Sequence, residues 1–140
     1  MGLRTLPTDR CGSRGSLFIL LYRGSDSVSA GFQSICMRAS QVGIHSSPDQ
    51  VNRACKILDS RRLGVSMILG DFGIVYNNER GPNWLRNITP HLDLAEQLGS
   101  SMIRICLKKQ DDIAHAQAAA DEARERDLIL VHQCHIGSIF

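Results

Sequence analysis

Four short apolar segments recur along the chain. They are separated by longer stretches in which apolar residues return every three or four positions. The apolar segments span residues 34–39, 65–71, 101–107 and 128–134, with starts 31, 36 and 27 residues apart. Short apolar runs bounded by polar residues are typical of buried strands, and the three-to-four spacing is typical of one helix face. The pattern therefore predicts strands that alternate with helices.

The first predicted helix has clear start and stop signals. It begins at Ser47, a good N-cap residue, and Pro48 suits the first helical position. Gly64 follows its last apolar residue, which is a common way for a helix to end. We therefore expect one regular helix between the first two regular strands.

The second and third helices have less regular signals. The second covers residues 82–98, where Pro90 should kink or split the helix and Thr89 can cap its second part. The third begins at Asp111 and extends to residue 126. Its buried stripe is predicted to be Ile113, Ala116, Ala120 and Ala123. Small residues in that stripe predict close packing.

A strand–helix repeat with a period near 30 residues predicts parallel strands with helices outside them. Two architectures follow: an open, flavodoxin-like sheet and a (β/α)8 barrel. A complete barrel needs roughly 250 residues, and this chain has about half of that. Residues 17–22 also resemble a strand, although the connection that follows is short for a parallel crossover.

Composition places the chain among ordinary globular domains. Its 140 residues are 43% hydrophobic and 21% charged, and the net charge of +2 does not indicate nucleic acid or membrane partners. The five cysteines lack close pairing and are expected to be reduced thiols of a cytoplasmic protein. Residues 1–30 are expected to form a flexible or degenerate N-terminal segment, and residues 31–140 the folded domain.

Charged residues lie toward the C-terminal ends of the predicted strands, where parallel α/β folds bind ligands. They are Arg38, Asp71, Arg104 and Lys108. Arg38 and Arg104 interrupt apolar segments, so each must be paired or must face a wet pocket. One interpretation is that Arg104 and Asp71 neutralise each other across neighbouring strands. The other is that this cationic edge holds the phosphate or carboxylate of a substrate.

The last predicted strand ends in His132, Gln133, Cys134 and His135. Alternation places Gln133 and His135 on one face and His132 with Cys134 on the other, without indicating which pair faces a ligand. Together with Cys106, one strand away, His132 and Cys134 offer zinc-type ligands. The alternative is a set of buried thiols and hydrogen-bonded histidines, because the spacings of common zinc motifs are absent.

Five segments together resemble the sugar phosphate isomerase/epimerase family. They read VSMILGDF at 65–72, NWLRNITPHLDLAEQLG at 83–99, MIRICLKKQDDI at 102–113, ADEA at 120–123 and VHQCHIGSIF at 131–140. This is the xylose isomerase-like TIM barrel superfamily, which also contains apurinic-endonuclease-like proteins. The resemblance covers about residues 31–140. It implies an α/β fold that is a partial (β/α)8 barrel, with four to five parallel strands and outer helices.

The resemblance also implies chemistry. Family members typically bind a divalent metal such as Mn²⁺, Mg²⁺ or Zn²⁺ at the C-terminal mouth, and interconvert sugars by proton transfer next to a carbonyl. Cys36 stands where the second strand often carries Glu, and Arg38 is retained. Gln133 stands where the fifth strand often ends in a metal-binding Glu, and His135 fits the His that follows.

These correspondences set the expectations for the site. The metal ligands would be Gln133 and His135. The substrate-binding residues would be Arg38, Asp71, Arg104, Lys108 and His135, and the ligand a sugar or sugar phosphate. Since Gln133 is neutral and the later barrel strands are absent, we expect this chain alone to lack isomerase activity.

The sequence also allows two other interpretations. The chain could be a non-catalytic half-barrel that binds a ligand or pairs with another chain, or it could be a truncated gene product. Self-association through the open barrel edge is also expected, because an unpaired strand edge is a template for pairing.

Overall fold

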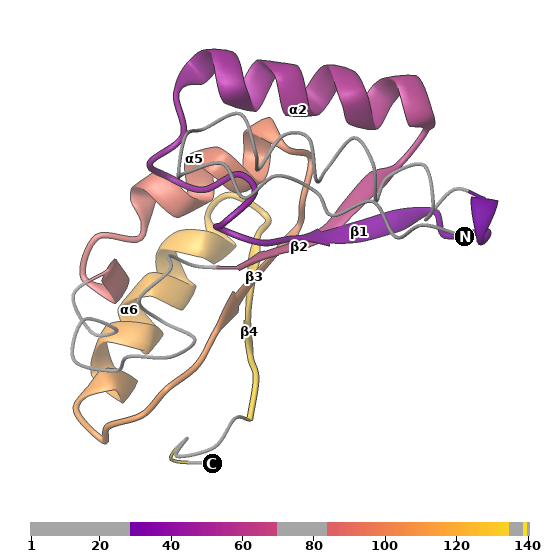
Figure 1. Cartoon of the computed structure of the whole chain (residues 1–140). Coiled ribbons are helices and arrows are strands. Elements are labelled where there is room, and N and C mark those ends of the chain that lie inside the picture. Colours follow the sequence, from indigo (N-terminus) through magenta and orange to yellow (C-terminus); the bar gives the residue numbers. More distant parts are fainter. Residues whose placement is uncertain (1–28, 70–83, 135–138, 140) are drawn as a thin grey trace, which may run out of the picture.

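The computed structural model describes residues 29–69, 84–134 and 139 (Figure 1). In chain order the elements are β1 (Ser34–Met37), α2 (Pro48–Arg61), β2 (Gly64–Leu69), α5 (Thr89–Gln97), β3 (Met102–Ile105), α6 (Asp112–Arg124) and β4 (Ile129–His132). Each strand lies within one of the four apolar segments or extends it by a single residue. The predicted alternation of strands and helices is confirmed for this part of the chain.

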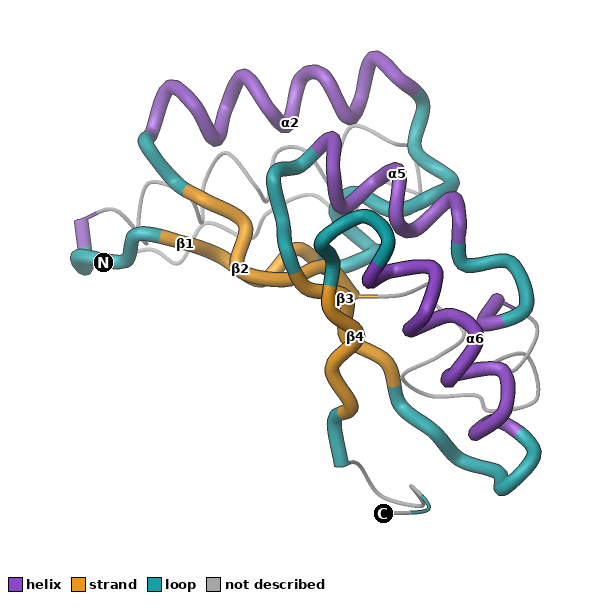
Figure 2. The backbone as a smooth tube through the Cα atoms, turned by 180° about the vertical axis from the view of Figure 1, so that it is seen from behind, coloured by secondary structure: helices purple, strands orange, loops and turns teal. Residues whose placement is uncertain are grey.

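The four described strands form one parallel sheet in the order β1-β2-β3-β4. The helices α2, α5 and α6 lie on the same side of that sheet, as the two opposite views show (Figures 1 and 2). A doubly wound sheet would reverse its strand order and carry helices on both faces. The sequential order and one-sided helices therefore decide against the open flavodoxin-like alternative.

The core lies between the sheet and its helices. Met37 pairs with Ile68, Ile68 with Ile103, and Ile103 with Leu130 across the sheet. The first three of these side chains are fully buried and the fourth is partly buried. Burying a large aliphatic side chain contributes about 1.5–3 kcal/mol, so this row is a major source of stability.

A β-bulge adjusts the register of the first two strands. Ile35 pairs with Val65, but Cys36 pairs with Met67, which leaves Ser66 as the extra residue of β2. The Ser66 hydroxyl donates to the Ile35 carbonyl at 3.1 Å. Because the bulge shifts the alternation by one residue, both Val65 and Ile68 can be buried on the helix side.

The start of α2 is as the sequence predicts. Ser47 is the N-cap, its hydroxyl accepts from the Gln50 backbone N–H, and the Gln50 side chain accepts from the Ser47 N–H. The end of α2 differs from the prediction, because Arg62 takes the left-handed position at φ 53° and Gly64 begins β2.

The second predicted helix is split near Pro90, as the sequence predicts. Within the described residues, 84 and 85 are helical, 86–88 are not, and α5 begins at Thr89 with Pro90 in its first turn. Thr89 does not cap this helix: Ile88 is the N-cap residue and makes no side-chain cap bond. The Thr89 hydroxyl instead donates to Glu122 Oε1 of α6 at 2.7 Å. The predicted end at Gly99 is confirmed by its φ of 65°.

The third helix is anchored by Asp112. Asp111 is the N-cap residue, where the sequence predicts the helix to begin, although its side chain makes no cap bond. Asp112, only 2% exposed, accepts from the backbone N–H groups of Lys108 and Lys109 through Oδ2. The buried face of α6 also differs from the predicted stripe by one position, since Ala119 is buried and Ala120 is only partly so.

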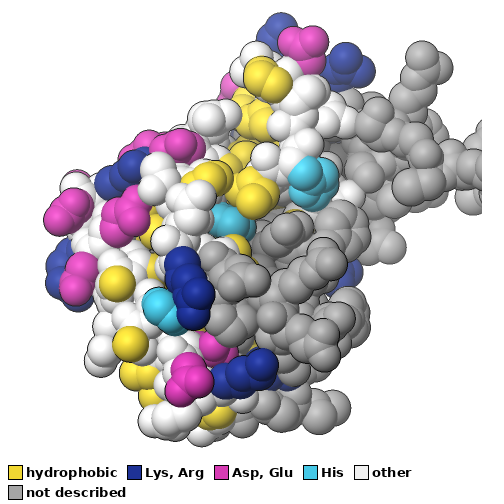
Figure 3. Space-filling model, turned by 90° about the vertical axis from the view of Figure 1, so that its left-hand side faces the viewer, with side chains coloured by type: hydrophobic (Ala, Val, Ile, Leu, Met, Phe, Trp, Pro, Cys, Tyr) yellow, Lys and Arg dark blue, Asp and Glu magenta, His cyan; other side chains and the backbone are white. Residues whose placement is uncertain are grey.

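Polar contacts join the two chain segments that contain α5 and α6. Arg126 bonds Asp93 at 2.6 Å and lies 3.7 Å from Glu96. Arg86 Nε donates to His115 Nε2 at 3.0 Å. The side of the molecule in Figure 3 shows charged side chains of both signs interspersed, without a large patch of one sign.

Two expectations lie largely or wholly outside the described residues. They concern the strand at 17–22 and the N-terminal segment 1–30, of which residues 29 and 30 are described. Within the described part, none of the helices is long and apolar enough to cross a membrane.

Candidate functional site

The register of the sheet defines its second face, which points away from the helices. Leu69 pairs with Arg104, and Arg104 with Val131. Alternation along each strand then assigns the other members of this face. We call it the inner face, and its residues are Cys36, Arg38, Met67, Leu69, Met102, Arg104, Cys106, Ile129, Val131 and Gln133. In a barrel of this type the face opposite the helices lines the interior.

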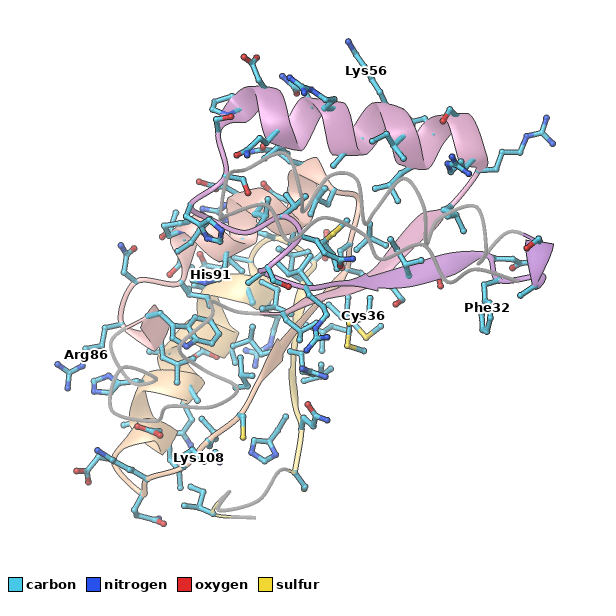
Figure 4. All side chains as sticks on the ribbon, in the orientation of Figure 1. Phe32, Cys36, Lys56, Arg86, His91 and Lys108 are labelled. Atoms are coloured by element: carbon cyan, nitrogen blue, oxygen red, sulfur yellow. The ribbon has the colours of Figure 1, made fainter. Side chains whose placement is uncertain are left out.

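Two arginines share the inner face with Cys36. Arg38 follows Cys36 by two residues, and Arg104 lies on β3, with β2 between them. Partial burial raises the pKa of the Cys36 thiol, and the positive charges of Arg104 and Arg38 act in the opposite direction. Figure 4 shows Cys36 on the side of the sheet that faces away from α2. Two of the five predicted substrate-binding residues thus share one face of the sheet, and the charges of both act on the same thiol.

The backbones of both arginines are well fixed. Arg38 begins a turn in which its carbonyl accepts from the N–H groups of Gln41 and Val42, at 2.8 and 3.1 Å. Arg104 lies inside β3, between two neighbouring strands. Among the described residues, neither guanidinium makes an ion pair or a hydrogen bond. Asp71, which the sequence predicts as the neutralising partner of Arg104, lies outside the described residues.

Lys108 is placed differently from the two arginines. It lies in the connection between β3 and α6, where its backbone N–H donates to Asp112 at 3.2 Å. Figure 4 shows it near the start of α6, well away from Cys36. Lys108 therefore does not join the two arginines, and its predicted role in substrate binding remains a prediction.

The register of β4 shows on which face of the sheet His132 and Gln133 lie. Ile105 pairs with His132, so His132 lies on the helix side, and Gln133 lies on the inner face, where it is exposed. The Gln133 backbone N–H continues the ladder by donating to the Ile105 carbonyl at 2.9 Å. Gln133, and not His132, is therefore the residue that shares a face with Arg104.

The described residues do not fit a divalent metal. Gln133 is a neutral ligand, and His135 lies outside the described part of the chain. No group of three His, Cys, Asp or Glu side chains suited to an ion occurs within it. Cys134 Sγ lies 4.0 Å from His132 Nδ1, but Cys106 is on the opposite face by alternation, which separates the three predicted zinc ligands.

The fold and this face together define the class of protein. A sequential parallel sheet with all its helices on one side, and ligand-type residues toward the strand ends, is half of a (β/α)8 barrel. Solved structures agree with this class. The chain matches a xylose isomerase-like TIM barrel protein from Mycobacterium smegmatis, in complex with magnesium, with a TM-score of 0.66 and 13% identity.

Two further structures show the same fold. A xylose isomerase domain protein from Planctomyces limnophilus matches with a TM-score of 0.64 and 10% identity, over 79% of this chain and 48% of its own. An AP endonuclease of family 2 from Brucella melitensis matches at 0.57 and 14% identity, over 80% and 48%. The M. smegmatis match covers 87% of this chain and 47% of the other. This chain therefore spans about half the length of these three structures.

Comparison by sequence adds nothing to these structural matches. No protein-family model matches the chain, and no curated protein does. The resemblance to the xylose isomerase-like TIM barrel superfamily is thus a resemblance of fold.

Proposed function

We propose that this chain is a half-barrel of the sugar isomerase/epimerase type that binds an anionic sugar, such as a sugar phosphate, on its inner face. One observation carries the proposal. Arg38 and Arg104 lie on the same face of the sheet, both close enough for their charges to act on Cys36, and neither guanidinium has an ion-pair partner among the described residues. Two guanidinium groups with no ion-pair partner in the described part of the chain favour an anion, because Arg matches phosphate oxygens with paired hydrogen bonds.

The surroundings favour a ligand with both charged and polar groups. Gln133 adds an amide that donates and accepts, as sugar hydroxyls require. Met67 and Met102 add partly buried apolar surface on the same face. A phosphate at the arginines and a sugar ring toward Gln133 is the arrangement that uses all of these groups.

The same residues do not supply isomerase chemistry. Proton transfer next to a carbonyl requires a base and a group that stabilises the developing negative charge. The inner face, as described, contains no carboxylate, and Gln133 cannot replace one as a base. We therefore assign binding to this chain, and place any proton transfer in residues beyond the described part or in a longer protein.

The test is titration calorimetry of the purified chain with sugar phosphates and with the corresponding unphosphorylated sugars. Hydrogen bonds to charged groups contribute about 1.5–3 kcal/mol, so Arg104→Gln should weaken phosphate binding about 10- to 100-fold. The control is Arg53→Gln on the exposed side of α2, which should leave the affinity unchanged.

Two results would contradict the proposal. One is equal affinity for the phosphorylated and unphosphorylated sugars. The other is equal weakening by Arg104→Gln and Arg53→Gln, because that would reflect general charge attraction and not a site.

A further inference from the structure

The inner face ends at an exposed apolar edge. Ile129 pairs with Met102 at the start of β4 and is 57% exposed, although residues at barrel-interior positions are normally buried. Within the described residues, β4 pairs with β3 alone. An apolar side chain beside an unpaired strand edge is the kind of surface that a partner covers.

The dimensions of the fold suit a second copy of this chain as that partner. The described sheet has four parallel strands, and a closed barrel of this class has eight. The matched structures are also about twice as long, since the chain covers 47–48% of three of them. We infer that two copies associate about a two-fold axis with their inner faces toward each other, so that each covers the other's Ile129.

A two-fold axis through this interface brings two cationic clusters together. Arg38 and Arg104 of one copy face the partner's Arg38 and the partner's Arg104 across the interior. Like charges in a partly desolvated space repel each other more strongly than in water. A phosphate held between them removes this repulsion, and the two copies then share one anion site. This step rests on the proposed anion binding, whereas the association itself does not.

Phosphate should therefore strengthen the dimer beyond the effect of salt. The experiment is sedimentation equilibrium of the purified chain in sodium phosphate and in sodium chloride of equal ionic strength. The expected species is a dimer of twice the 15.5 kDa chain mass, with a dissociation constant at least tenfold lower in phosphate. Arg104→Gln should dimerise equally in both salts.

Ile129→Asp tests the surface itself. It places a charge in the proposed interface and should give a monomer in both salts. Asn52→Asp adds the same charge to an exposed position of α2 and should leave the dimer intact. Circular dichroism checks that both variants keep the helix content of the unmodified chain.

The outcomes separate the two proposals. A wild-type monomer at all concentrations, or an open series of larger species, overturns the association, even if phosphate still binds in calorimetry. A dimer that Ile129→Asp leaves intact overturns this choice of surface. A dimer that is insensitive to phosphate overturns the shared site alone.

Discussion

Cys36 is the residue whose setting the sequence does not reveal. The sequence resemblance leads one to expect a carboxylate at this position, whereas in the structure the charges that act on the thiol are those of Arg104 and Arg38. Partial burial raises the pKa of its thiol, and the charges of Arg104 and then Arg38 oppose that effect. The pKa of Cys36 is therefore a direct report on whether these guanidinium groups lie where the site requires them.

Removing Arg104 should raise the pKa of Cys36 further. Arg104→Ala deletes a positive charge that stabilises the thiolate, so alkylation by iodoacetamide should shift to higher pH and become slower at pH 8. The rate is followed at the Cys36 peptide by mass spectrometry, because the chain has five cysteines. Arg53→Ala serves as the control. If the pH profile of Cys36 alkylation is unchanged in Arg104→Ala, the Arg104 charge does not act on the Cys36 thiol, and the basis for the anion site is lost.

At the scale of elements, local signals predict helix starts better than they predict strand faces. Ser47 and Pro48 specify the start of α2 because the cap forms within four residues of chain. The bulge at Ser66 cannot be predicted in this way, since it depends on the pairing of β2 with β1. Thr89 was mistaken for a cap because its hydroxyl bonds a helix that comes later in the sequence.

The small residues of α6 set how closely that helix approaches the sheet. Ala123 is fully buried on the face of α6 that packs toward β4. Ala123→Leu should cost about 1–3 kcal/mol by overpacking, whereas Ala118→Leu, on the exposed side, should stay within about 0.5 kcal/mol. Urea denaturation at one protein concentration measures both. Equal midpoints for the two variants would mean that α6 does not pack as described.

At the scale of the whole molecule, the strand–helix period predicts parallel strands and outer helices, and the structure confirms both. The sequence predicts less well which side chains come together in the candidate site. The sequence grouped Arg38, Arg104 and Lys108, but only the two arginines share the inner face, because Lys108 lies beyond β3 in a connection bonded to Asp112. Residue spacing along one chain does not determine which side chains meet across strands.

We propose that this half-barrel binds an anionic sugar without completing the isomerase reaction. The most direct test measures the incorporation of solvent deuterium next to the carbonyl in a panel of sugar phosphates, with Mg²⁺ or Mn²⁺ added. We predict no incorporation above the buffer rate under conditions where calorimetry detects binding, because the inner face offers Gln133 in place of a carboxylate. Enzymatic incorporation by the wild-type chain that is lost in Gln133→Ala would contradict the claim.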